Sequence, residues 1–169
     1  MKIHLIGTGD VFSSRLSPSF VLDGCILIET PNGISKMLIN QNEKIENLSL
    51  CLISHLHGDH FWDMPFLLLN KNKTKGKKVT VVGPVGIKKN IFKCCQMAFS
   101  SLDWEQIFYN TIENIYELSE NEQINHEQYK VFAISVEHGN EKCFGFKIIN
   151  KDKKVFSYLM LKSFNDRRG

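Results

Sequence analysis

Short runs of hydrophobic residues, separated by turn-forming residues, dominate the first third of this 169-residue chain. Lys2–Ile6 is the first run. Ser19–Leu22 and Cys25–Glu29 follow, joined by an Asp-Gly dipeptide that is typical of β-hairpins. Leu50–Ile53 is apolar without polar alternation, which predicts a strand buried on both faces. The pattern therefore predicts three strands before the first helical segment and a fourth after it.

Three segments of the chain show helical spacing. Ile34–Ile45 carries apolar residues at positions 34, 37, 38 and 45, as an amphipathic helix does. Phe61–Asn70 is apolar almost throughout, and Pro65 lies early enough for a first helical turn. Ile87–Phe99 places its apolar residues on one face. We predict a helix in each of these three segments.

Strand-like runs return in the second half of the chain. A polar turn at 150–153 joins the last two of them as a hairpin. A length of 169 residues suits one domain with a sizeable core, so we expect residues 1–169 to form a single domain of mixed α/β or α+β class. The predicted strands are Val79–Val82, Ile112–Leu118, Val131–Val136, Cys143–Ile149 and Lys154–Leu161.

Composition narrows the class of protein. With 43% hydrophobic and 23% charged residues the chain is not globally disordered, and a net charge of +3 permits a phosphate-bearing substrate without indicating one. The sequence has no signal-peptide core and no run long enough to span a bilayer, so we expect a cytoplasmic protein. The cysteines lack Cys-x-x-Cys spacing and predict reduced thiols, mostly in the core; they are Cys25, Cys51, Cys94, Cys95 and Cys143.

The densest chemistry lies directly after the buried strand, in Ser-His-Leu-His-Gly-Asp-His at positions 54–60. On an extended backbone His55 and His57 lie on one side, while Gly58 allows a turn that directs Asp59 and His60 to a neighbouring point. Imidazole nitrogens and carboxylates are ligands that Zn²⁺ prefers, so the motif predicts a site for one or two metal ions. The alternative is a set of ordinary polar loop residues or helix caps, which this spacing disfavours.

This motif resembles the signature of the metallo-β-lactamase superfamily, and the whole string resembles its ribonuclease Z-like branch. The resemblance extends over residues 1–158. It includes a first strand with a glycine turn, an Arg-x-x-x-Ser element, a Gly-Pro-x-Gly turn and a strand-end histidine. These features are Ile6–Asp10, Arg15 with Ser19, Val82–Gly86, and Val136–His138 with Gly145.

The resemblance implies a fold and a chemistry. The fold is an αββα sandwich of two mixed sheets with helices outside. His55, His57 and His138 would bind the first metal, and Asp59 and His60 a second; zinc is expected, with Mn²⁺ or Fe²⁺ as alternatives. A zinc ion lowers the pKa of water from about 15.7 to about 7, and Asp59 would accept the proton. The reaction implied is phosphodiester hydrolysis, in this branch endonucleolytic cleavage at the 3′ end of precursor tRNA.

The C-terminal sequence departs from the family pattern. After a strand like that ending at Tyr158 the family carries Ser-Gly-Asp-Thr, whose aspartate bridges two metals, whereas this chain has Leu159–Lys162. The chain then stops at Gly169, before the family's last helices and final histidine, and neither Asp152 nor Asp166 matches the motif. We therefore expect a sandwich incomplete at the C-terminus, with an exposed sheet edge or face. A homodimer is a further expectation, without direct support in the sequence.

Several functions stay open at this point. One is an active RNA hydrolase with one metal or a weakly bound second one. Another is a small-molecule metallo-hydrolase acting on a phosphodiester, lactone or thioester. A third is a metal-binding or interaction protein without catalysis, or a truncated family member.

Two other segments carry potential phosphate chemistry. Lys71–Lys78 holds five lysines, which steer polyanions in some proteins and are solvated surface in most. The glycine amides of Val82–Gly86 open a helix and either bind phosphate or form a structural turn. His4 and His126 match no ligand position, and Cys51 is expected in the core rather than at the metal.

Overall fold

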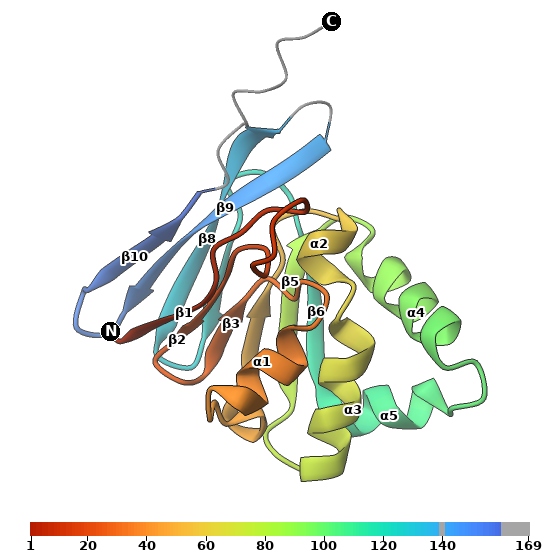
Figure 1. The fold of residues 1–169 in the computed structure, drawn as a ribbon. Coiled ribbons are helices and arrows are strands. Elements are labelled where there is room, and N and C mark those ends of the chain that lie inside the picture. Colours follow the sequence, from red (N-terminus) through yellow and green to blue (C-terminus); the bar gives the residue numbers. More distant parts are fainter. Residues whose placement is uncertain (139–140, 160–169) are drawn as a thin grey trace, which may run out of the picture.

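The computed structural model describes residues 1–138 and 141–159, with only the backbone at positions 138, 141 and 142. Its larger sheet has six strands, and their order across the sheet is their order in the chain (Figure 1). The first three strands pair antiparallel and the rest pair parallel, so this sheet is mixed, as predicted. The strands are β1 (Ile3–Gly7), β2 (Ser19–Leu22), β3 (Ile26–Ile28), β4 (Leu50–Leu52), β5 (Val79–Pro84) and β6 (Ile112–Leu118).

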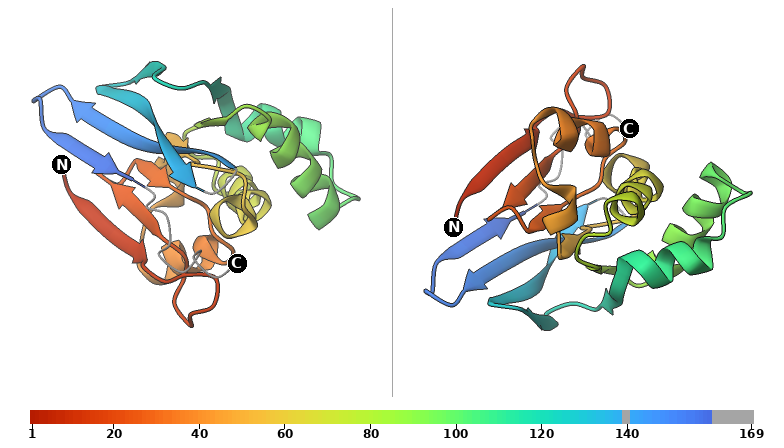
Figure 2. Two further views of the ribbon diagram at one scale, coloured as in Figure 1. Left: turned by 90° about the horizontal axis from the view of Figure 1, so that it is seen from above. Right: turned by 90° about the horizontal axis from the view of Figure 1, so that it is seen from below.

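The second sheet has four strands in the order β10-β9-β8-β7 and packs face to face on the first (Figure 2). All of its pairs are antiparallel, so the expectation of two mixed sheets was wrong here. The reason is connection length, because the short links between these strands cannot make the crossover that parallel pairing needs. The strands are β7 (Gln123–His126), β8 (Tyr129–His138), β9 (Glu141–Asn150) and β10 (Val155–Tyr158).

The helices pack on the face of the larger sheet that points away from the second sheet (Figure 2). In the described part of the chain no helix covers the outer face of the second sheet, so three of the four layers of the sandwich are present. The helices are α1 (Ile34–Asn40), the 3₁₀ helix η1 (Ile45–Asn47), α2 (Gly58–Phe61), α3 (Met64–Thr74), α4 (Ile87–Ala98) and α5 (Trp104–Thr111).

Two hydrophobic cores lie on the two sides of the larger sheet. Successive residues of a strand point to opposite faces. Leu27 and Cys51 therefore join the helix-side core, while Ile28 and Leu52 join the core between the sheets. Every residue of β3, β4 and β5 is buried, which confirms for β4 the predicted burial on both faces. Burial of each such aliphatic side chain stabilises the fold by about 1.5–3 kcal/mol.

Two helix boundaries differ from the prediction. The predicted helix 34–45 ends at Asn40, because Asn42 has a positive φ of 58° and the chain continues into η1. Asp63 separates α2 from α3, and its two carboxylate oxygens accept hydrogen bonds from the backbone N–H groups of Gly33 and Ser35, each at 2.8 Å. The carboxylate thus ties the start of α1 to the segment that follows the histidine motif.

Helix α5 and strand β7 were not predicted. The α5 signal is present in the sequence: Asp103 is an N-cap that accepts a hydrogen bond from the Gln106 N–H at 3.0 Å. Trp104, Ile107 and Thr111 then recur at helical spacing and are buried.

The remaining expectations concern the thiols, the membrane and the last strand. All five cysteines are free thiols, as predicted. Within residues 1–138 and 141–159, no helix has the length and apolar character needed to cross a membrane. The last predicted strand is present as β10 (Val155–Tyr158), and positions 160 and 161 of that prediction lie outside the described residues.

Candidate metal centre

The histidine motif begins two residues after β4, at the carboxyl-terminal end of the parallel strands. His57 keeps an extended backbone (φ −70°, ψ 143°), as predicted, and α2 begins at Gly58, three residues before the predicted helix. Gly58 itself does not form the expected tight turn. Its hydrogen faces the Trp62 ring, and a β-carbon there would collide with that ring.

Three imidazole rings of the motif lie together. The centroid of the His55 ring is 4.6 Å from that of His57 and 4.2 Å from that of His60. His55 is 1% exposed and His60 is 5% exposed, while His57 faces solvent. The three rings therefore form one cluster that extends from the protein interior to its surface.

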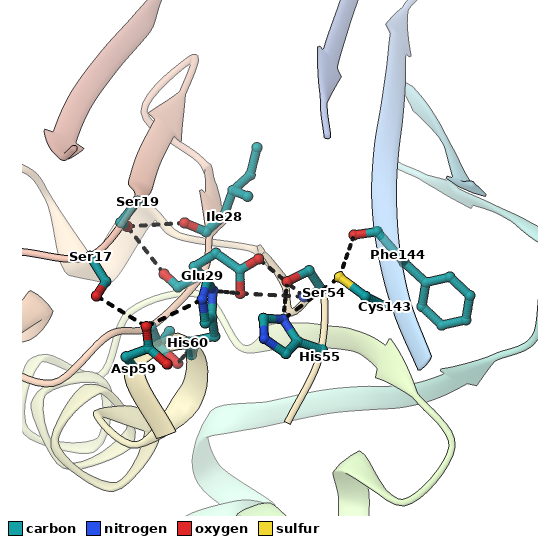
Figure 3. Close-up of polar contacts among 11 residues, drawn as sticks. Ser17, Ser19, Ile28, Glu29, Ser54, His55, Asp59, His60, Cys143 and Phe144 are labelled. Carbon is teal, nitrogen blue, oxygen red and sulfur yellow. Dashed lines mark hydrogen bonds and ion pairs between the residues drawn. The ribbon is translucent and has the colours of Figure 1, made fainter. Parts of the chain in front are cut away.

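Asp59 lies at the edge of this cluster (Figure 3). Its Oδ2 is 3.5 Å from His60 Nε2 and accepts a hydrogen bond from the Ser17 hydroxyl at 3.3 Å. Ser17 belongs to the long loop between β1 and β2. The carboxylate is thus held between that loop and His60, with its side chain 30% exposed.

Glu29 is the residue that the sequence analysis missed. Its side chain is fully buried beneath the motif, it accepts the Ser54 N–H at 3.2 and 3.3 Å, and its Oε2 is 3.5 Å from His60 Nδ1 (Figure 3). Burial disfavours a charged His60, but the hydrogen bond and charge of Glu29, with Asp59, outweigh burial and raise the pKa of His60. Glu29 also has a positive φ of 62°, which costs energy for a non-glycine residue.

Ser19 supports this conformation of Glu29. The buried Ser19 hydroxyl lies 3.0 Å from the Ile28 carbonyl oxygen and 3.2 Å from that of Glu29. Both carbonyls belong to the end of β3, where the chain turns away from the sheet. The serine of the Arg-x-x-x-Ser element therefore holds the backbone of the buried acid, while Arg15 is exposed.

The second sheet reaches the motif through β9. The Phe144 N–H donates to the Ser54 carbonyl at 2.9 Å, and Cys143 Sγ lies 3.8 Å from His55 Nδ1. The Ser54 hydroxyl lies 2.8 Å from the same nitrogen. Burial raises the pKa of the Cys143 thiol to about 11, so the sulfur is a protonated neighbour of His55 at neutral pH.

Tyr158, at the end of β10, closes the site from the same sheet. Burial, followed by the negative charge of Glu29, raises the pKa of its phenol. The phenolic oxygen is enclosed near the Glu29 carboxylate.

His138 is the remaining predicted ligand. Its backbone ends β8, opposite Glu141, which confirms a strand-end position. Its side chain lies outside the described residues, so its role as a ligand stays a prediction.

Residues 1–160 match a family model described as "Anti-Pycsar protein Apyc1". The chain belongs to the Apyc1 family. It is also similar to ribonuclease Z of Staphylococcus carnosus, with 28% identity over 158 residues, covering 88% of this chain and 49% of that protein. Ribonuclease Z of Listeria monocytogenes is 29% identical over 167 residues, covering 90% of this chain and 50% of that protein. This Apyc1-family chain spans about half the length of these relatives.

Solved structures support the predicted fold. The short form of human tRNase Z superimposes with a TM-score of 0.74 at 23% identity, covering 93% of this chain and 67% of that one. The metallo-β-lactamase fold protein YhfI of Bacillus subtilis gives 0.66 at 14% identity, covering 92% and 60%. The Apyc1-family chain therefore has the metallo-β-lactamase fold and is related to ribonuclease Z.

The donor set in this Apyc1-family site fits zinc in type. It offers neutral imidazoles and carboxylates, and a zinc phosphodiesterase of Bos taurus is 28% identical over 122 residues, which cover 66% of this chain and 34% of that protein. Among the side chains that the structure describes, no three histidine, cysteine or acidic groups are arranged to hold a metal ion as they stand. The described residues alone therefore do not make up a metal site, and the ligand set that includes His138 stays a prediction.

The two other phosphate candidates have structural roles. Glu117 Oε1 accepts hydrogen bonds from the N–H groups of Gly86 and Lys88, each at 3.1 Å, so a carboxylate already occupies the start of α4. In the lysine segment, Lys71 is buried and donates to the carbonyls of Ile45 and Leu48. The segment also precedes β5, which places it at the opposite end of the parallel strands from the histidines.

The other histidines are structural, as predicted. His4 Nδ1 contacts the Glu43 carboxylate, and His126 Nε2 lies 3.1 Å from the Ser49 hydroxyl. Cys51 lies in the helix-side core and is fully buried, also as predicted.

Proposed function

We propose that this chain is a metal-dependent hydrolase that cleaves the phosphodiester bond of a small nucleotide. The observation that carries the proposal is the cluster of three imidazoles around His55, with Asp59 at its edge and Glu29 beneath it. Such convergence of ligand types is costly to maintain without a bound cation. Membership of the Apyc1 family and similarity to ribonuclease Z both support phosphodiester chemistry.

In this proposal His55, His57 and His138 hold a zinc ion, and Asp59 with His60 contributes to a second, weaker position. When bound, zinc supplies a Lewis acid that makes hydroxide available at neutral pH. The rest of the chemistry falls to the residues of the chain.

Asp59 is the proposed proton acceptor for the attacking water. Its carboxylate is partly exposed, so it can pass the proton to solvent, and the Ser17 hydroxyl fixes its orientation. Ser54 holds Nδ1 of His55 and so directs Nε2 toward a ligand. Glu29 orients His60 in the same way.

A small nucleotide is favoured over tRNA as substrate. The Apyc1 family is one of cyclic nucleotide phosphodiesterases, and the lysine segment lies away from the histidines. No insertion that would grip tRNA is present among residues 1–138 and 141–159. Precursor tRNA is the second candidate, favoured by the ribonuclease Z relatives.

The test combines metal analysis with turnover. Zinc per chain is measured by elemental analysis, and hydrolysis is followed for a panel of 3′,5′-cyclic nucleotides and a precursor tRNA. We expect bound zinc and cyclic nucleotide turnover. Asp59→Asn should lower kcat by about 10²–10⁴-fold. His57→Ala should lose both zinc and turnover, while His126→Ala, which alters a histidine outside the motif, should keep both.

The outcomes separate the alternatives. Cleavage of tRNA without turnover of any cyclic nucleotide would favour the second substrate. A zinc-loaded protein that hydrolyses neither would contradict the proposal and favour a metal-binding protein without catalysis.

A further inference from the structure

A cavity of about 290 Å³ lies beside the histidine cluster, where the ends of β5 and β6 meet the second sheet. It takes no part in the chemistry described above. We propose that it binds the nucleobase of a nucleotide whose phosphodiester lies at the histidines, with preference for a base that carries an exocyclic amino group. This inference rests on the proposed function and names the part of the substrate that the site selects.

The cavity adjoins the cluster through Cys143. This residue lines the cavity, and its sulfur also lies 3.8 Å from His55 Nδ1. The next residue, Phe144, lines the cavity too, and its N–H donates to the carbonyl of Ser54 in the motif. The wall of the cavity is therefore fixed to the histidine loop, which places the cavity next to that loop.

The lining suits a flat heterocycle. Leu118, Phe144 and Pro84 supply apolar surface, and Ser119 and Ser135 supply hydroxyls at the rim. Ligand sites generally combine an apolar lining with a few polar groups that fix orientation. A volume of about 290 Å³ is at the small end of such sites, which favours a single nucleotide over a polynucleotide.

Charge sets the orientation of the ligand. Glu120 is the charged residue of the lining, and no lysine or arginine of the described chain lines the cavity. A carboxylate repels phosphate, so the phosphodiester is expected at the histidine end. A carboxylate also only accepts hydrogen bonds, so it favours a base with an amino donor over one with a carbonyl at the same position.

The rim is already ordered. Glu122 Oε2 accepts the Ser119 N–H at 2.7 Å, and the Glu122 carbonyl accepts the Ala133 N–H at 2.9 Å. These bonds fix the turn between β6 and β7 against β8. A preformed rim reduces the entropy lost when a ligand binds.

The experiment measures binding of nucleosides, which carry no phosphate, by NMR titration of the full chain. Adenosine has an amino group at position 6 and an acceptor at N1, whereas inosine has a carbonyl at position 6 and an N–H donor at N1. Adenosine should shift the amide signals of Ser119, Ser135 and Phe144. It should bind about tenfold more tightly than inosine, the factor expected for one hydrogen bond to a charged group.

Two variants and one control complete the design. Ser135→Phe fills the cavity and should weaken adenosine binding at least about tenfold. Ser157→Phe makes the same change at an exposed serine of the same sheet that does not line the cavity, and should have no effect. Glu120→Gln, in an exposed turn, should reduce the ratio of adenosine to inosine affinity toward one even if Ser135→Phe does not fold.

Equal affinity of the unaltered protein for the two nucleosides, or adenosine binding that survives in folded Ser135→Phe, would overturn the inference. Nucleoside binding requires neither metal nor turnover. Binding at the cavity without hydrolysis of any nucleotide would therefore support this inference while contradicting the proposed function.

Discussion

The two ends of the six-stranded sheet contain many of the same residue types, but the contacts of these side chains differ between the ends. At the end where β4 finishes, His55, His60 and Asp59 face one another above Glu29. At the other end, three polar side chains each have a separate partner: Lys71 the carbonyls of Ile45 and Leu48, His126 the Ser49 hydroxyl, and Lys77 the Glu127 carboxylate.

The difference shows that local density of charge does not by itself indicate a ligand site. Five lysines in eight residues form a segment whose members are divided between the core, an ion pair, an aromatic contact over Tyr109 and solvent. Three histidines in six residues lie together, with the His57 and His60 ring centroids 4.6 and 4.2 Å from that of His55. The two ends of the sheet therefore differ in whether their polar side chains contact one another.

The largest expected effect is at Glu29. Glu29→Ala removes the acceptor for the buried Ser54 N–H and the partner of His60, and should lower the free energy of unfolding by about 3 kcal/mol. Zinc affinity should fall by about 10–100-fold, because an outer residue no longer orients a ligand. Urea denaturation and competition with a chelator measure the two effects.

Glu127→Ala is the matched control at the other end. It breaks the exposed ion pair with Lys77 and should change stability by less than about 0.5 kcal/mol. Equal effects of the two substitutions would remove the contrast between the ends.

The next largest effect is a dependence of stability on pH that is due to Lys71. Burial lowers its pKa to about 8 from the usual 10.5. The unfolded chain therefore binds more protons than the folded one between these values, and stability should rise as pH increases through about 8 toward 10.5. Between pH 7.5 and 9.5 the gain should be on the order of 1 kcal/mol relative to Lys71→Met. Parallel urea curves with no pH-dependent difference would show that Lys71 is not buried as described.

Ser17→Ala tests the orientation of Asp59. The hydroxyl donates to the carboxylate from a buried position, so its loss should lower kcat about tenfold while KM stays the same. Ser13→Ala, in the same loop but exposed, is the control and should leave kcat unchanged. A rise in KM alone would indicate that Ser17 contacts substrate instead.

The smallest effect is expected from the lysine segment. Lys73 and Lys75 are exposed at the end away from the histidines. The double substitution Lys73→Glu, Lys75→Glu should change turnover of a cyclic nucleotide by less than about twofold, since charges farther apart than a Debye length are screened. A large loss of turnover at physiological salt would show that this segment does contact the substrate.

Much of this arrangement was predictable from local pattern. The uninterrupted apolar run before the motif placed β4 correctly, and the His-x-His spacing correctly predicted two rings on one side of an extended segment. Glu29 could not be found this way. It follows an apolar strand like any surface acid, and only the tertiary structure shows that it turns inward with a positive φ.

Other features could not be predicted because they depend on pairing between segments that are distant in the sequence. The antiparallel second sheet includes β7, whose four residues alternate too briefly to stand out. Cys143 was assigned to a strand, but its contact with His55 joins residues 88 positions apart, a separation that no local pattern encodes. The α5 signal, by contrast, was in the sequence, in Asp103 and the spacing of Trp104, Ile107 and Thr111.

The order of the strands has a consequence for biosynthesis. Every strand of both sheets pairs with the strand before or after it in the chain. Because a nascent chain leaves the ribosome from its N-terminus, each strand can find its neighbour as soon as it emerges. The larger sheet is complete at Leu118, whereas Cys143 and Tyr158 emerge later. The histidine loop is therefore translated first and enclosed last, when the final hairpin docks.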